Sequence, residues 1–403
     1  MKVKGAILTV LLVVMVALLS GCWNQRELNK IAIVMAMGVD KVEQTDNYRV
    51  SFQVVNPGAV ASGQTGGGAG AVEMPVTVFT STGRTLLEAI RKSSQRVPRE
   101  LFFSHMQLLV IGEDLAKSGV TELFDYFDRG HEVRLTTKVI VTRGTKAESI
   151  LKILTPLEKI PANGLAGEMD MSEKLWSENI NNTIDDVIKT FVTEGKNPII
   201  SGAAIIGNTK EGFKKTEQSS PPTLMETRGV AIFKDGKLSR WVDGHAARGI
   251  LLVQNKVKST LVVLKPTGNK EVDIEILRSL TDVRTEIKAG IPLIHIRIRQ
   301  EGQLGGITYP LDLSKSKELV KLQKEWSKVT NKEVKEAVKV AESAKSDIFG
   351  IGEGMKRSNP KEWEGLKKEW NETFVKAKVY VTVDSIIRRT GMRTKPYLSD
   401  LEE

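Results

Sequence analysis

Short apolar runs alternate with helix-like periodicity through the first half of the chain. The run 31–37 is continuously apolar and 48–55 partly alternates, which predicts two strands joined by a polar turn. Strand-like runs at 106–111 and 137–141 flank 114–127, where apolar residues recur at helical intervals. The same patterns predict helices at 85–96, 146–154 and 184–194, and strands at 76–79 and 198–206. Strands alternating with helices require crossover connections, so we expect a helix-covered sheet.

The second half groups its strands before its helices. Two apolar runs flank Asp235-Gly236, a dipeptide typical of two-residue hairpin turns. The stretch 291–301 (IPLIHIRIRQE) alternates cleanly, so one face of this strand should be buried and the other solvated. A long amphipathic helix is predicted at about 314–346, a further helix begins at Pro360, and a final strand covers 375–387. We expect a multi-domain α+β fold, with mixed β-sheets covered by helices and the long helix in the C-terminal domain.

The first 21 residues have the pattern of an export signal. Lys2 and Lys4 precede 6–19, an uncharged and almost wholly apolar run of 14 residues. A membrane-spanning helix needs roughly 20 such residues. The shorter run fits the core of a signal peptide, so we expect residues 1–21 to be removed.

Cys22, the only cysteine of the chain, follows this signal. Leu19-Ser20-Gly21-Cys22 resembles a bacterial lipobox, which implies an N-palmitoyl, S-diacylglycerol cysteine at position 22. The alternative is an incidental thiol, but a free thiol in an exported protein is a liability and no second cysteine can pair with it. Two acyl chains anchor a protein stably, so we expect a chain anchored to a membrane rather than spanning it.

Charge and composition narrow the class of partner. Without residues 1–21 the chain has 57 Lys and Arg against 49 Asp and Glu, a formal charge of +8. The lysines are spread along the chain with little aromatic interleaving, so we expect no nucleic-acid partner and favour anionic headgroups or wall polymers. The polar stretch around Ser219-Ser220-Pro221-Pro222 marks a domain boundary. We expect a 22–206 α/β region, either one domain or two interleaved ones, a linker at 207–224, and a C-terminal α+β domain at 225–395.

Few residues have the spacing of a chemical site. None of the four histidines is paired with another His, Cys or carboxylate at metal-ligand spacing. His295 reads as a solvated strand residue, whereas His245, between Asp243 and Arg248, leaves a small polar site conceivable. The acidic cluster Glu168, Asp170 and Glu173 lacks calcium-loop spacing and reads as a solvated loop. The glycine-rich stretch 57–71 has no following Gly-Lys-Ser/Thr and reads as a flexible surface loop.

The sequence therefore offers no catalytic, cofactor-binding or metal-binding residue. It contains no Gly-x-Ser-x-Gly, and its single thiol is assigned to the anchor. The spacing of Trp326, Trp363 and Trp370 is typical of core residues, whereas Trp23 follows the lipidated cysteine and should lie among lipid headgroups.

Several stretches, in order, resemble the Ger(x)C family, the C subunits of spore germinant receptors. They are GCWNQRELNKIAIVMAMGVDK at 21–41, RGVAIFKDGKLSRWVDGHAARGILL at 228–252, DIFGIGE at 347–353, NPKEW at 359–363, WNETF at 370–374 and IRRTG at 387–391. The resemblance implies three α+β domains without known catalytic residues, and it carries over one functional residue, Cys22. It also implies a lipoprotein on the outer face of the spore inner membrane. Such a subunit works with integral A and B subunits in a nutrient response that leads to ion and dipicolinate release.

Two other classes compete with this interpretation. A lipid-anchored solute-binding protein would deliver a ligand to a transporter and usually has two similar α/β lobes, whereas the halves here differ. A wall enzyme tethered by lipid would be recognised by activity on peptidoglycan that a single carboxylate substitution abolishes. The sequence supplies no candidate pair of carboxylates for such an enzyme.

Overall fold

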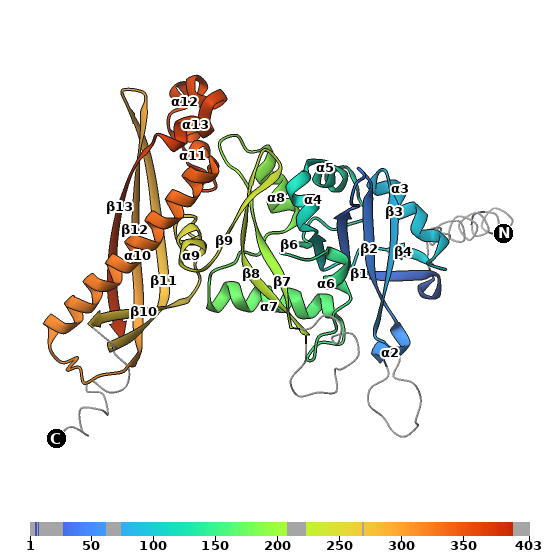
Figure 1. Cartoon of the computed structure of the whole chain (residues 1–403), viewed down its shortest axis with the longest axis horizontal. Helices are drawn as coiled ribbons and strands as arrows, with labels where there is room; N and C mark the ends of the chain where they lie inside the picture. Colours follow the sequence, from blue (N-terminus) through green and yellow to red (C-terminus); the bar gives the residue numbers. More distant parts are fainter. Residues whose placement is uncertain are drawn as a thin grey trace.

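The structure, a computed structural model, describes residues 27–61, 74–207, 223–267 and 270–389, with two isolated positions near the N terminus. Cys22, Trp23, most of the glycine-rich stretch and most of the predicted linker lie outside the described residues. Figure 1 shows an elongated molecule in which two β-sheets follow one another along the long axis. The expected multi-domain α+β architecture, with helices covering mixed sheets, is confirmed.

The first sheet has nine strands among the described residues, in the order β3-β2-β1-β5-β6-β7-β8-β9, with β4 beside β1. Its central strands β1, β5, β6 and β7 are parallel, whereas antiparallel strands extend the sheet on both sides. The parallel centre confirms the expected crossover connections. The strands are β1 Ile31–Lys41, β2 Tyr48–Val55, β3 Val76–Gly83, β4 Glu100–Phe102, β5 Leu108–Ile111, β6 Lys138–Thr142, β7 Ile199–Gly207, β8 Thr223–Lys234 and β9 Lys237–Val242.

Helices cover both faces of the first sheet. Leu109 and Ile111 of β5 belong to the core beneath α3, α4, α5 and α8, and Leu108 and Val110 belong to the core beneath α6 and α7. Burial on both faces explains why this strand is continuously apolar. The helices of this part are α2 Pro57–Ala61, α3 Leu86–Lys92, α4 Glu113–Ser118, α5 Thr121–Arg129, α6 Ala147–Leu151, α7 Pro161–Leu175 and α8 Ile184–Val192, with 3-10 turns at Leu28–Lys30 and Ser93–Gln95.

Three predictions for this part are wrong. The start of the glycine-rich stretch, expected to belong to a flexible surface loop, is helix α2 at Pro57–Ala61. The expected single helix at 114–127 is two helices, because Gly119 has a φ of 136° and interrupts the helical backbone between α4 and α5. The acidic cluster expected in a solvated loop lies on helix α7. Glycines at 164 and 167 obscured its periodicity. Pro161 at its first turn suits a helix start.

The second sheet has the order β10-β11-β12-β13. Its first three strands are antiparallel, and β13 joins parallel to β12. Burial alternates along β12 as predicted, with Ile294, Ile296 and Ile298 buried and the residues between them facing outward. The elements are α9 Gly244–Val253, β10 Thr260–Thr267, β11 Lys270–Lys288, β12 Ile291–Ile307, α10 Ser316–Ala344, α11 Ile351–Ser358, α12 Pro360–Leu366, a 3-10 turn at Lys367–Glu369, α13 Trp370–Val375 and β13 Lys378–Arg389.

The long helix and the core tryptophans are confirmed. α10 lies across one face of the second sheet (Figure 1) and ends where Lys345 adopts a left-handed φ of 48°. Trp326, Trp363 and Trp370 are buried in the cores on this side of the chain.

The predicted hairpin is also confirmed. Asp235 and Gly236 both have positive φ, 50° and 76°, which a type I′ turn requires. β8 in turn pairs with β7, from Ile199 opposite Ile232 to Gly207 opposite Thr223. The strands before and after the predicted linker 207–224 therefore pair within one sheet. The division into a 22–206 region and a 225–395 domain stays a prediction.

Candidate functional site at the junction of the two sheets

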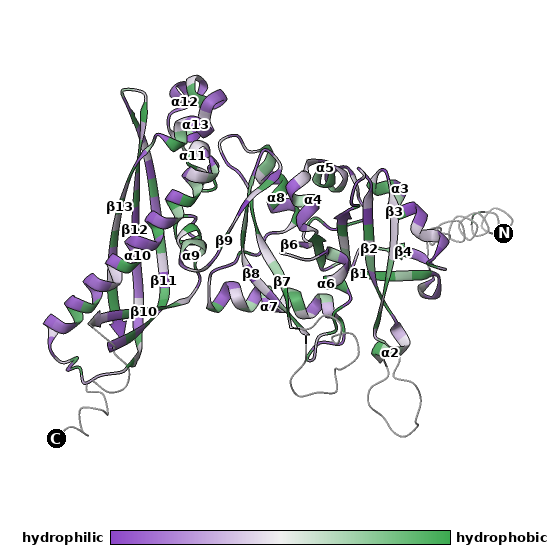
Figure 2. Ribbon diagram, in the orientation of Figure 1, coloured by the Kyte–Doolittle hydropathy of each residue, from purple (hydrophilic) through white to green (hydrophobic). Residues whose placement is uncertain are grey.

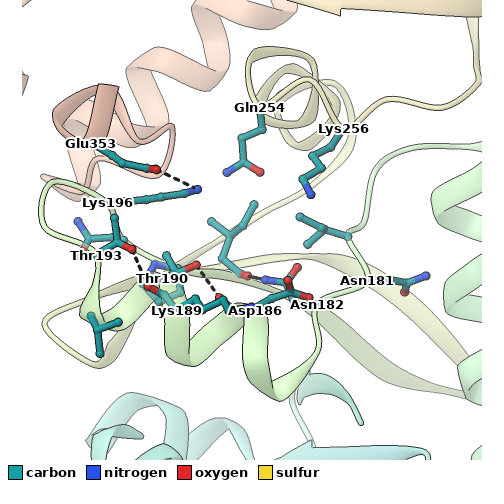
Figure 3. Close-up of a pocket in the computed structure, with 15 residues that line it drawn as sticks. Asn181, Asn182, Asp186, Lys189, Thr190, Thr193, Lys196, Gln254, Lys256 and Glu353 are labelled. Atoms are coloured by element: carbon teal, nitrogen blue, oxygen red, sulfur yellow. Dashed lines mark hydrogen bonds and ion pairs between the residues drawn. The ribbon is translucent and has the colours of Figure 1, made fainter. Parts of the chain in front are cut away.

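A polar cleft of about 450 Å³ opens where the first sheet meets the helices of the second. Figure 3 shows Lys196, Gln254 and Lys256 converging on this space from different walls, opposite α8. Helix α8, the segments before and after it up to the first residue of β7, the residues just after α9 and the start of α11 supply the lining. These residues are Ile180, Asn181, Asn182, Asp186, Lys189, Thr190, Val192, Thr193, Lys196, Asn197, Pro198, Ile199, Gln254, Lys256 and Glu353.

Most charged groups of the cleft already have protein partners. The Lys189 ammonium lies 2.5 Å from Asp185, and the Lys196 ammonium lies 3.6 Å from Glu353. Asp186, in the first turn of α8, forms a capping box with Thr183, the residue before the helix. Among the described residues, Lys256 has no ion-pair partner. The walls can bind a small polar group, but they present neither His nor Cys as a nucleophile or base.

The buried carboxylate of Asp347 organises the chain beside this cleft. One oxygen accepts backbone N–H groups of Phe349, Gly350 and Ile351 at 3.1, 2.9 and 3.2 Å. The other accepts the Gly352 N–H at 2.8 Å and the Trp370 indole N–H at 2.9 Å. Burial raises the pKa of Asp347, while these donors act in the opposite direction. The carboxylate thus fixes the start of α11 and the position of α13.

Two glycines let the first part of the chain approach this carboxylate. Gly195 has a φ of 75°, and a Cβ on it would lie 2.6 Å from the carbonyl carbon of Gly352. A Cβ on Gly352 would lie 2.6 Å from the indole nitrogen of Trp370. The Asn197 N–H donates to the Asp347 carbonyl at 2.8 Å, and Lys356 pairs with Glu194 at 3.0 Å. The loop 193–198 is therefore held against α11 by backbone contact.

The stretch 228–252 makes a second set of contacts across the fold. The Trp241 indole N–H donates to Glu113 at 3.0 Å, and the Arg143 guanidinium lies 5.2 Å from the Trp241 ring centroid. Arg143 also contacts Asp243 at 2.5 Å. These bonds fasten β9 and the start of α9 to α4 and to the loop after β6.

His245 and Arg248 come together, but around a structural ion pair. Arg248 is 2 % exposed, and its guanidinium donates to the buried carboxylate of Glu333 on α10. The guanidinium also donates to the Leu261 carbonyl at 2.9 Å, and one of its nitrogens lies 3.0 Å from His245 Nδ1. Because the buried donors and acceptors are paired with one another, this cluster joins α9 to α10 and leaves no open polar site.

The acidic cluster on α7 is also engaged in contacts within the fold. Glu173 pairs with Lys258 at 2.5 Å, and Asp170 pairs with Lys138 at 2.6 Å. Partial burial of the carboxyl, and then repulsion from Glu226, raise the pKa of Glu168 to about 7, although much of its side chain is exposed.

Neither His295 nor any group of possible metal ligands in the described residues forms a further candidate site. His295 lies on the outer face of β12, as predicted. Its ring stacks on that of Tyr380 with the centroids 5.1 Å apart, and its Nε2 lies 3.1 Å from the Glu286 carboxylate. Within the described part of the chain, no three His, Cys, Asp or Glu residues lie close enough to hold a metal ion. In the same part, no helix is long and apolar enough to cross a membrane. Cys22, the one predicted site residue, lies outside the described residues.

The sequence patterns did not reveal the junction itself. Asp347, Gly352 and Trp370 lie in the stretches DIFGIGE and WNETF, whose resemblance to a family was the available signal. Their partner Gly195 lies in a segment that shows no pattern. The structure brings these separate stretches together around one buried carboxylate.

Comparison with known proteins finds matches that span these stretches. A family model described as spore germination protein N-terminal domain matches residues 24–205, and one described as spore germination B3/GerAC like, C-terminal, matches 228–391. The chain is 35% identical over 400 residues to spore germination protein KC of Bacillus subtilis, covering 98% of each chain. It is 28% identical to the putative spore germination protein YfkR of B. subtilis, covering 94% of this chain and 95% of that one.

A solved structure shares the fold. The crystal structure of the GerBC protein superimposes with a TM-score of 0.56 at 18% identity, covering 88% of this chain and 98% of that chain. The two family models together match most of the chain, and the KC relative matches nearly all of it. The chain therefore belongs to the Ger(x)C family of spore germination proteins.

Proposed function

We propose that this chain is a lipid-anchored, non-enzymatic C subunit of a nutrient germinant receptor that takes part in triggering spore germination. The observation that carries the proposal is the full-length match to spore germination proteins, 98% of each chain for the KC relative. In this proposal Cys22 carries the lipid, and the subunit lies on the outer face of the spore inner membrane. It associates there with the integral A and B subunits.

The non-enzymatic role is supported by what the family stretches do in the fold. Asp347, Trp370, Trp241 and Arg248 are used in contacts that join one part of the chain to another. A scaffold that couples two membrane subunits needs fixed internal junctions of this kind. The solute-binding alternative has less support, because a nine-stranded sheet and a four-stranded sheet do not form two similar lobes.

Isolation of the tagged protein from spore inner membranes tests this proposal. We expect the A and B subunits to co-purify and the intact mass to include the lipids on Cys22. Cys22→Ala should shift the protein out of the membrane fraction at high salt in detergent-free buffer. Recovery of the unmodified protein from the soluble fraction, without either subunit, would contradict the proposal.

A further inference from the structure

Seven lysines form a straight ridge along α10. They recur at intervals of three or four residues, which at about 100° per residue places them within an arc of roughly 80°. From the first to the last the helix rises by about 33 Å. All seven side chains are exposed, and Figure 2 shows hydrophilic residues recurring along the whole helix. The lysine ridge consists of Lys317, Lys321, Lys324, Lys328, Lys332, Lys335 and Lys339.

The ridge lies on the side of α10 opposite the core. Trp326, Thr330 and Ala337 on the inner side of the helix are each 0% exposed. Two ridge lysines have ion-pair partners on the same helix: Lys328 at 2.7 Å and Lys332 at 3.9 Å. The other five have none among the described residues. Most of the positive charge along the ridge is therefore available to an external partner.

We propose that the lysine ridge rests on an anionic lipid surface. Its shape suits this partner, because a straight line of ammonium groups can approach a flat layer of headgroups along its whole length. Each lysine near such a surface contributes about a fivefold gain in partition. The exposed Val320, beside the start of the ridge, adds an apolar contact. The proposal rests on the proposed membrane location but not on the role in germination.

The residue types on the ridge argue against a nucleic acid. Proteins that read duplexes combine Arg or Lys with Asn or Gln for contacts to base edges, and those that bind single strands stack bases on aromatic side chains. The ridge positions hold lysine alone. Lysine is a compact, strongly hydrated point charge, which suits attraction to headgroups without fixed geometry.

Lysine footprinting of the full-length protein on vesicles tests the proposal. The purified protein is bound to vesicles of phosphatidylcholine alone, or of phosphatidylcholine mixed with phosphatidylglycerol, and treated with an amine-reactive reagent. We expect severalfold protection of the ridge lysines on the mixed vesicles only, reversed by high salt. The exposed Lys174, Lys361 and Lys368 lack ion pairs in the described structure and serve as references that should stay reactive.

Substitutions sharpen the test. The triple variant Lys321→Gln, Lys324→Gln and Lys335→Gln should favour the undocked state. The ratio of molecules with the ridge on the lipid surface to molecules with the ridge in solvent should fall on the order of 100-fold. The remaining ridge lysines then lose their protection. The matched triple Lys174→Gln, Lys361→Gln and Lys368→Gln should leave the ridge protected. Glutamine keeps the helix propensity of lysine, so the fold is retained.

The outcomes separate this proposal from the proposed function. Flotation with neutral vesicles reports the lipid anchor alone, and the vesicles contain no other receptor subunit. Equal labelling of the ridge on both kinds of vesicle would overturn the ridge proposal and leave the receptor role standing. Protection in whole inner membranes but not on anionic vesicles would also overturn it, and would assign the ridge to an acidic protein surface.

Discussion

Replacing Asp347 tests whether one buried carboxylate holds the junction together. Its first oxygen accepts three backbone N–H groups, and its second accepts the Gly352 N–H and the Trp370 indole N–H. Asparagine has nearly the same shape, and its carbonyl oxygen can keep the first three bonds. Its NH2 group would then face the Gly352 and Trp370 N–H groups, from which it cannot accept hydrogen bonds.

The expected loss follows from this geometry. A hydrogen bond to a charged group contributes about 1.5–3 kcal/mol net, so losing two gives about 3 kcal/mol or more for Asp347→Asn. Asp347→Ala leaves all five donors without the carboxylate and opens a cavity, so we expect a larger loss, of more than about 5 kcal/mol. Urea unfolding of the detergent-solubilised chain, followed by tryptophan fluorescence, measures both values, since Trp370 lies against the altered group.

A second aspartate provides the control. Asp312 also accepts hydrogen bonds, from the N–H and hydroxyl of Ser314, but its side chain is 31% exposed. Water can replace those bonds, so Asp312→Asn should cost less than about 1 kcal/mol. If Asp347→Asn were as stable as the parent within about 0.5 kcal/mol, the carboxylate would not hold the junction and the reasoning would be refuted.

Three further predictions concern other parts of the fold. Gly195→Ala forces a side chain into a left-handed position against α11, so it should destabilise by about 2 kcal/mol and speed amide exchange in α11; unchanged exchange would contradict the contact. Arg248→Met should cost about 3–5 kcal/mol because Glu333 is left buried, and adding Glu333→Leu should recover most of it in urea unfolding; no recovery would show that the pair is not buried as described. The pKa of Glu168 is raised from 4.5 to about 7, so its contribution to stability is greatest below pH 4.5 and is lost as pH rises through 7; an NMR titration should find this value, and Glu226→Gln should lower it.

Much of the fold was predictable because its patterns are local. The alternation in 291–301, the helical spacing around Trp326 and the Asp235-Gly236 turn each depend on neighbours within a few residues, and the structure confirms all three. The predictions were wrong where glycine altered a local pattern. Gly119 divided an expected helix, and the glycines in Pro161–Leu175 hid a real one.

The junction was not predictable, because its partners lie far apart in the sequence. Gly195 and Gly352 lie in separate halves of the chain, and neither has a periodic pattern around it. Asp347 follows directly after the predicted long helix, and no local pattern marks it. Its importance arises only when the indole of Trp370 and the amides of α11 surround it. The resemblance marked these stretches without giving their role.

Nutrient-triggered dipicolinate release tests the central claim most directly. Spores without this gene, spores with Cys22→Ala and parent spores are exposed to single nutrients, and release is normalised to the total freed by boiling. We predict that the deletion and Cys22→Ala abolish the response to one class of nutrient and leave the responses to others intact. Unchanged release for every nutrient, in a strain with no second copy of this receptor, would contradict the assignment as a germinant-receptor subunit.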